Sequence, residues 1–213
     1  MRAVFLLLSF FILLNKGHAQ TATPSFSKSL EAAVLMFDKS QTQQQYDLIF
    51  AKMEELHLQD PSAWLPAYYA SIIKARMAIK KMGNSEKLSE EAIKWLAIAK
   101  ELHYSDEVLC LESLVYTSKM SVSPTFRWNA YESKIKKPLE QAIGLNKNNP
   151  RAYLLKASLA YRLPFFYGGG CKAAIPMLQK ANGIFETQKN EFTVMPHWGR
   201  ALVLELVKAC PID

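Results

Sequence analysis

The stretches Asp60-Pro61-Ser62-Ala63-Trp64 and Asn149-Pro150-Arg151-Ala152-Tyr153 decide the fold. Each places a capping side chain directly before a proline, an arrangement that suits the first turn of a helix. The chain carries four helix-start markers, Pro61, Asp106, Pro150 and Pro196, of which the second lacks a proline. Successive markers are 45, 44 and 46 residues apart. A nearly constant period of this length is typical of stacked helical repeats.

A second pattern recurs inside each interval, at positions 0, +4 and +7 of one helix face. The four sets are Tyr46, Phe50 and Met53; Ala92, Leu96 and Ala99; Ile135, Leu139 and Ala142; and Ala174, Leu178 and Ala181. In two sets, small residues flank a larger one and let a neighbouring helix approach closely. The constant phase of this pattern to the markers predicts one helix pair in each interval.

Apolar spacing is helical almost throughout and only eight glycines occur, so the chain is predicted to be all-α. The expected helices lie near residues 26–38, 42–58, 62–81, 86–103, 106–121, 127–146, 150–163, 171–188 and 196–209. Because Pro176 would disturb a helix interior, the regular helix there is expected to begin between Lys172 and Ile175. We expect a right-handed stack of antiparallel helix pairs, a short solenoid of about eight to nine helices.

The first residues have the layout of a secretory signal peptide, with Arg2, an apolar run from Ala3 to Leu14, and small residues Gly17 and Ala19 before a cut. Domains are therefore expected at 1–19 (signal) and 20–213 (repeat domain). The run is too short to span a membrane, and no later run is long and apolar enough to do so. Removal of the signal segment takes away Arg2 and Lys16. The remaining chain then has 24 basic and 19 acidic residues and a net charge of +5. These charges are scattered, so nucleic-acid binding is not expected.

Ala92-x3-Leu96-x2-Ala99 and Ala174-x3-Leu178-x2-Ala181 resemble the second-helix signature of tetratricopeptide repeats, and the two opening stretches resemble its repeat junction. Residues 64–70 and 166–174 resemble segments of small exported repeat proteins of Bacteroidetes. The likeness runs from about Tyr46 to the C-terminus. It implies stacked helix pairs that present a binding surface. The period near 45 departs from the tetratricopeptide length of about 34 and falls in the range of Heat-type repeats.

The loop from Leu163 to Gly170 is the most distinctive segment. Its three glycines precede a helix, so their amides could bind an anion beside an aromatic wall of Phe165, Phe166 and Tyr167. The alternative is a tight turn in which the glycines allow positive φ.

Aromatic and basic residues at helical spacing suggest a groove lined by the first helix of each pair. The alternative is that most of these aromatics form the core. The candidate binding residues are Tyr69, Tyr116, Lys156, Tyr161, Arg162, Phe166, Tyr167, Gly168, Gly169, Gly170, His197 and Arg200.

Catalytic and metal-binding patterns are absent from the sequence, so we predict no enzyme, no metal and no cofactor. The three cysteines, Cys110, Cys171 and Cys210, match no metal or redox motif. Buried thiols are favoured, and one disulfide is the alternative.

The leading functional hypothesis is an exported scaffold that binds an unidentified protein or peptide partner. The alternative is a small-ligand-binding accessory component of a periplasmic uptake system, motivated by the Gly-rich loop and by Lys172, Arg162 and Arg200. An enzyme of unrecognised type is a third hypothesis.

Overall fold

The computed structural model describes residues 24–188 and 193–210, so the predicted signal segment 1–19 lies outside them. The helices are α1 (Pro24–Lys39), α2 (Gln43–Gln59), α3 (Trp64–Ile79), α4 (Ser85–Leu102), α5 (Asp106–Ser121), α6 (Pro124–Leu145), α7 (Pro150–Arg162), α8 (Cys171–Thr187) and α9 (Arg200–Ala209). A short 3-10 turn, η1 (Phe165–Tyr167), precedes α8. In the described ranges there is no strand, and the all-α prediction is confirmed.

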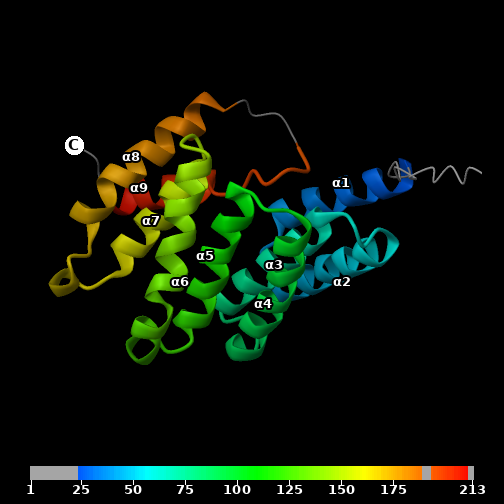
Figure 1. Ribbon diagram of the computed structural model, residues 1–213, viewed down its shortest axis with the longest axis horizontal. Helices are drawn as coiled ribbons and strands as arrows, with labels where there is room; N and C mark the ends of the chain where they lie inside the picture. The colour runs from blue at the N-terminus through cyan, green and yellow to red at the C-terminus, as the bar shows by residue number, and fades with distance from the viewer. Residues whose placement is uncertain (1–23, 189–192, 211–213) are drawn as a thin grey trace, which may run out of the picture.

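Neighbouring helices pack antiparallel in sequence order, so that α3–α4, α5–α6 and α7–α8 form pairs (Figure 1). The pairs contact one another through their first helices, α3 with α5 and α5 with α7, and through the contacts of α4 with α5 and of α6 with α7. Eleven of the twelve residues in the 0, +4, +7 pattern are buried, and Phe50 is half-buried. The predicted helix-pair stack is therefore present, because each pair covers its apolar face with the next.

The first repeat marker does not start a helix as predicted. Pro61 lies in a turn, and α3 begins only at Trp64, after Ala63, which has no capping side chain.

Capping side chains start the helices at the second and third repeat markers. The Ser105 hydroxyl accepts from the Val108 amide before α5, and the Asn149 side chain accepts from the Arg151 amide before α7. A cap of this kind contributes about 1 kcal/mol to helix stability. The sequence pattern located these starts because the capping chemistry is local.

The last helix begins later than expected, at Arg200 rather than near residue 196. Residues 193–199 form no helix, and Gly199 caps α9 with φ +112. A Cβ at Gly199 would lie 2.8 Å from Leu154 Cδ2, so a side chain there would push α9 away from α7. Glycine thus lets the chain turn sharply into α9 after crossing the stack.

The segment 193–199 returns to the first helices (Figure 1). The Tyr69 hydroxyl donates to the Val194 carbonyl at 2.9 Å, and the Trp198 indole N–H donates to the Tyr68 hydroxyl at 2.8 Å. A buried hydrogen bond contributes about 1 kcal/mol and costs more when one partner is lost. These contacts join the C-terminal part of the chain to α3.

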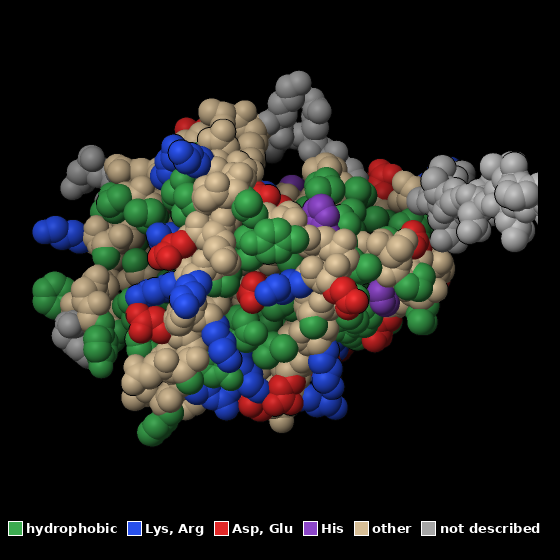
Figure 2. Space-filling model, viewed as in Figure 1, with side chains coloured by type: hydrophobic (Ala, Val, Ile, Leu, Met, Phe, Trp, Pro, Cys, Tyr) green, Lys and Arg blue, Asp and Glu red, His purple; other side chains and the backbone are tan. Residues whose placement is uncertain are grey.

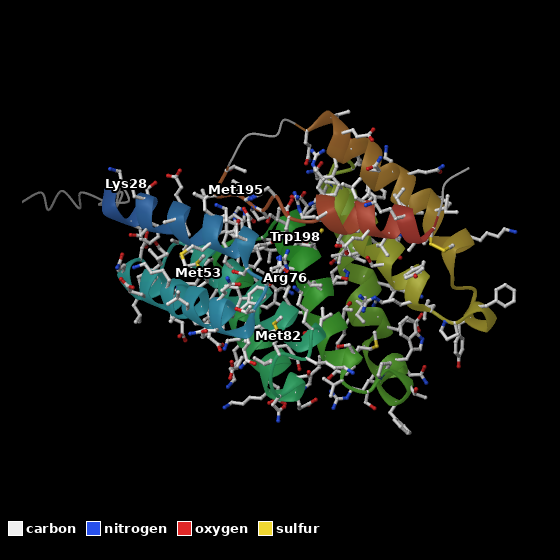
Figure 3. The ribbon with its side chains drawn as sticks, turned by 180° about the vertical axis from the view of Figure 1, so that it is seen from behind. Lys28, Met53, Arg76, Met82, Met195 and Trp198 are labelled. Carbon is white, nitrogen blue, oxygen red and sulfur yellow. A yellow bond between two sulfur atoms is a disulfide. The ribbon has the colours of Figure 1, made fainter. Side chains whose placement is uncertain are left out.

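A disulfide joins Cys171 at the start of α8 to Cys210 at the end of α9, with 5.2 Å between their Cα atoms (Figure 3). Cys110 is a buried free thiol. The preference for three buried thiols was therefore wrong for two of them. The pair is 39 residues apart in sequence and meets only because α8 and α9 lie side by side.

Helix α8 also begins at Cys171, ahead of the range expected from Pro176. The Ala174 amide donates to the Gly170 carbonyl at 3.2 Å, so the first turn forms before the proline. Pro176 lies within the helix and is exposed, and it forgoes one backbone hydrogen bond there.

The surface carries mixed charge on the face that Figure 2 presents, with Lys and Arg interspersed among Asp and Glu. Lys119 of α5, for example, donates to Glu90 at 2.9 Å and also contacts Glu86, both on α4. Within the described residues, no helix has the length and apolar character needed to cross a bilayer.

Candidate functional site

A cavity of about 1000 Å³ lies against the inner helices α3, α5 and α7 and is bordered by the chain around the start of α9. This volume is at the upper end of the range for ligand pockets, roughly 300–1,000 Å³. The apolar part of its lining comprises Ile79, Leu114, Met120, Pro124, Trp128, Leu155, Leu159, Leu163, Pro164, Trp198 and Leu202. A mostly apolar wall of this size can take a bulky hydrophobic molecule.

Cations outnumber carboxylates on the cavity wall. The basic residues are Arg76, Lys80, Arg162 and Arg200, and the acidic residues are Asp38 and Glu205. Asp38 contacts His197, with 2.7 Å between the carboxylate and Nε2. Its hydrogen bond to His197 raises the pKa of that imidazole. The carboxylate of Asp38 therefore has a partner in His197. Because cations are in excess on the rest of the wall, the cavity favours an anionic ligand.

Arg76 lies in the last turn of α3, where the helix meets the cavity (Figure 3). Its guanidinium carbon lies 4.4 Å from the ring centroid of Phe37 and 5.6 Å from that of Trp198. Burial lowers the pKa of Arg76, and the neighbouring Tyr46 hydroxyl, which accepts a hydrogen bond, partly counteracts this. The cation is thus held between aromatic side chains from α1 and from segment 193–199.

The other basic groups on the wall are either bonded to backbone carbonyls or exposed to solvent. A guanidinium N–H of Arg200 donates to the Phe185 and Gln188 carbonyls. Lys80 lies over the Tyr46 ring at 5.5 Å and is exposed, as is Arg162. Arg76 is therefore the most enclosed cation that borders the cavity.

The sequence-derived candidates do not gather on one face. Arg162, Tyr167, His197 and Arg200 line the cavity. Tyr69 is buried in the core instead, where burial raises the pKa of its hydroxyl. Tyr116 packs against Tyr131 of α6, outside the cavity. Lys156 and Tyr161 of α7 are also outside the cavity wall, and the side chain of Phe166 lies outside what the structure describes.

The glycine loop has a compact geometry. The amides of Gly168, Gly169 and Gly170 donate to the carbonyls of Phe165, Pro164 and Ala160, respectively. A Cβ at Gly169 would lie 2.0 Å from the Leu163 carbonyl oxygen. This geometry agrees with the tight-turn alternative, because all three amides already have backbone acceptors. A ligand contact through this loop stays a prediction.

Sequence reasoning missed Arg76, which it did not single out. A usable signal was present, because Lys74 and Arg76 are the two cations in an otherwise largely apolar helix. Lys74 forms an ion pair with Glu91 at 2.9 Å, whereas Arg76 borders the cavity. Only the tertiary structure shows that the surroundings of these two cations differ.

The described ranges contain no candidate metal centre. No three His, Cys, Asp or Glu side chains come together there to hold a metal ion.

Comparisons with known proteins gave one informative result. No protein-family model matches the chain, and no curated protein matches it. Among solved structures, the chain is similar to the HusA haemophore from Porphyromonas gingivalis, with a TM-score of 0.79 and 26% sequence identity. The match covers 90% of this chain and 95% of the haemophore. The chain is therefore similar over nearly its whole length to a binding protein from a Bacteroidetes species.

Proposed function

We propose that the chain is an exported, non-catalytic carrier that binds a haem-like tetrapyrrole in the cavity between α3, α5, α7 and the start of α9. The observation that carries this proposal is the coincidence of two findings. The inner helices border a cavity of about 1000 Å³, and the fold is similar along nearly its full length to a haemophore.

The chemistry of the cavity suits such a ligand. A tetrapyrrole is a flat, largely apolar ring with acidic side chains at one edge. Trp128 and Trp198 offer aromatic surface among aliphatic side chains, and contacts of aromatic rings add about 0.5–1.5 kcal/mol beyond burial. The excess of cations on the wall complements the acidic edge.

Several wall residues could also contact a haem iron. The protein side chains that usually bind haem iron are those of histidine, cysteine, methionine and tyrosine. Tyr46, Met120, Tyr167 and His197 are the residues of these types on the wall. His197 would first have to leave its contact with Asp38.

The scaffold hypothesis is less well supported than this ligand-binding alternative, because the similar structure is a haemophore. Export remains part of the proposal and rests on the signal-like segment 1–19 and on this similarity. A tetratricopeptide-like repeat is likewise proposed, on the small-residue helix pattern and the repeat-junction stretches at residues 60–64 and 149–153.

The test is a titration of the purified protein with haemin, followed by the absorbance change of the bound chromophore. Ser158→Trp places an indole in the cavity, since Ser158 lies on its wall. Ser133→Trp is the matched control, because Ser133 is exposed on α6 and outside the cavity. We expect saturable binding to the wild type and to Ser133→Trp, and loss of binding in Ser158→Trp with an unchanged helical circular-dichroism spectrum. No saturable binding to the wild type, or equal binding by all three, would reject the proposal.

A further inference from the structure

Arg76 has an unusual position for a charged side chain. Its neighbours along α3, Ala75 and Met77, are fully buried, and its guanidinium lies over Phe37 and near Trp198. The side chain remains half-buried because it borders the cavity. A cation placed there loses much of its hydration while keeping one side open to whatever fills the cavity.

The described residues provide Arg76 with no carboxylate within ion-pair distance. Its polar partner is the Tyr46 hydroxyl. The acid that acts on it from farther away is Asp38, which contacts His197 at 2.7 Å. Since a guanidinium carries five N–H donors, most of its hydrogen-bonding capacity is left over.

The other enclosed cations are paired. Lys74 pairs with Glu91 at 2.9 Å, Lys119 pairs with Glu90 at 2.9 Å, and Arg151 donates through Nε to Glu107 at 2.7 Å. Each of these three side chains is buried, and each has a carboxylate partner in the fold. Arg76 differs from them in that no carboxylate of the described residues pairs with it.

We propose that Arg76 binds a carboxylate of the ligand at the inner end of the cavity, through bidentate hydrogen bonds from its guanidinium to the two carboxylate oxygens. This inference rests on the proposed function and names the ligand group that the cavity recognises. The planar guanidinium matches the two oxygens of a carboxylate, and such charged contacts are stronger than neutral hydrogen bonds. Phe37 and Trp198 lie beside the guanidinium, 4.4 Å and 5.6 Å from its carbon to their ring centroids, and restrict where it can move.

The rest of the wall selects which anion fits. Leu114, Leu155 and Leu159 line the cavity beyond Arg76. A small, fully hydrated anion would leave these apolar surfaces uncovered. A large apolar acid covers them and places its charged edge on the arginine, so the ligand class is a hydrophobic ring bearing carboxylates.

The test compares haemin with haemin dimethyl ester, which has the same ring and iron but no free carboxylate. Both are titrated into the wild-type protein in the same detergent-containing buffer. We expect haemin to bind about 10- to 100-fold more tightly than the ester, the size of effect expected for charged hydrogen bonds. Arg76→Met should lose this preference, and Arg76→Lys should keep part of it.

Lys94→Met is the matched control, since Lys94 is exposed on α4 and lies outside the cavity wall. It removes the same charge and should change the preference by no more than about 3-fold, because exposed charges are screened. The wild-type comparison needs no variant, so it stands even if Arg76→Met folds poorly.

Equal binding of haemin and its ester to the wild type would overturn the role of Arg76 and leave the proposed function standing. The same conclusion would follow if Arg76→Met kept the full preference. Failure of both compounds to bind would reject the proposed function, and the Arg76 contact with it.

Discussion

Two arginines lie near the same indole ring and have different surroundings. The guanidinium carbon of Arg151, at the start of α7, is 5.9 Å from the Trp198 ring centroid, and that of Arg76 is 5.6 Å away. Arg151 contacts both carboxylate oxygens of Glu107, whereas Arg76 faces a cavity. A buried charge with its own partner holds the fold, and a charge left without one is available to a ligand.

The Arg151 site is a complete network. The Asn149 side chain donates to Glu107 at 2.9 Å and to Asp106 at 2.8 Å, so the cap of α7 is joined to the first turn of α5. Burial raises the pKa of Glu107, although Arg151 and Asn149 oppose the shift. Burial lowers the pKa of Arg151, but the contacts with Glu107 outweigh it and raise that pKa overall.

The largest effect is expected from Glu107→Ala. This change leaves Arg151 buried without its carboxylate, which costs about 3–5 kcal/mol. Guanidinium chloride unfolding measures the loss. A loss under about 1 kcal/mol would contradict a structural role for the Arg151–Glu107 pair and would remove its contrast with Arg76.

The double variant Cys171→Ser, Cys210→Ser should have the next largest effect. The disulfide closes a 39-residue separation, and such bonds typically contribute about 2–4 kcal/mol by restricting the unfolded chain. The same unfolding experiment applies, with Cys110→Ala as a control that leaves the bond intact. If reducing agent lowers the stability of the wild type and of the double variant equally, the bond is not the cause.

Arg76→Met should change the free energy of unfolding by no more than about 1 kcal/mol. Removing an unpaired charge relieves its desolvation, and this gain offsets the lost contacts with Phe37 and Trp198. Denaturant unfolding beside Glu107→Ala makes the comparison direct. A loss as large as that of Glu107→Ala would show that Arg76 holds the fold as Arg151 does.

The smallest effect concerns pH. Asp38 raises the pKa of His197, so the contact between α1 and segment 193–199 is strongest when His197 is protonated. Its contribution is complete below the ordinary histidine pKa of about 6.5 and is lost as pH rises through the higher folded value. We expect less than about 1 kcal/mol in total, because the pair is partly exposed.

Thermal unfolding at pH 6 and pH 8 checks this expectation. The stability difference between wild type and His197→Gln should be larger at pH 6 and should shrink at pH 8. A difference that grows with pH would contradict the assignment of the raised pKa to the Asp38 contact.

The helices could be predicted from the sequence because their signals are local. Caps such as Ser105 and Asn149 and the buried 0, +4, +7 face place eight helices within about three residues of their observed ends. The exception is α9, whose start depends on Gly199 fitting against Leu154 of another helix. A contact of that kind has no local signal.

The cavity was predictable only in part. Arg162, His197 and Arg200 were singled out as candidates for a groove lined by the first helices, and Tyr167 as part of the aromatic wall of the glycine loop. All four line the cavity. Arg76 was not singled out, because the run around it indicates core. Its proposed role depends on the absence of a carboxylate beside it, which is a property of the packed structure.

The most direct test of the central claim is a crystal structure of the protein with haemin. We expect the ring in the cavity between α3, α5 and α7, with a carboxylate oxygen about 2.7–2.9 Å from the Arg76 guanidinium nitrogens. A ring bound on the outer surface of the stack, or one in the cavity with both carboxylates turned to solvent away from Arg76, would contradict the account.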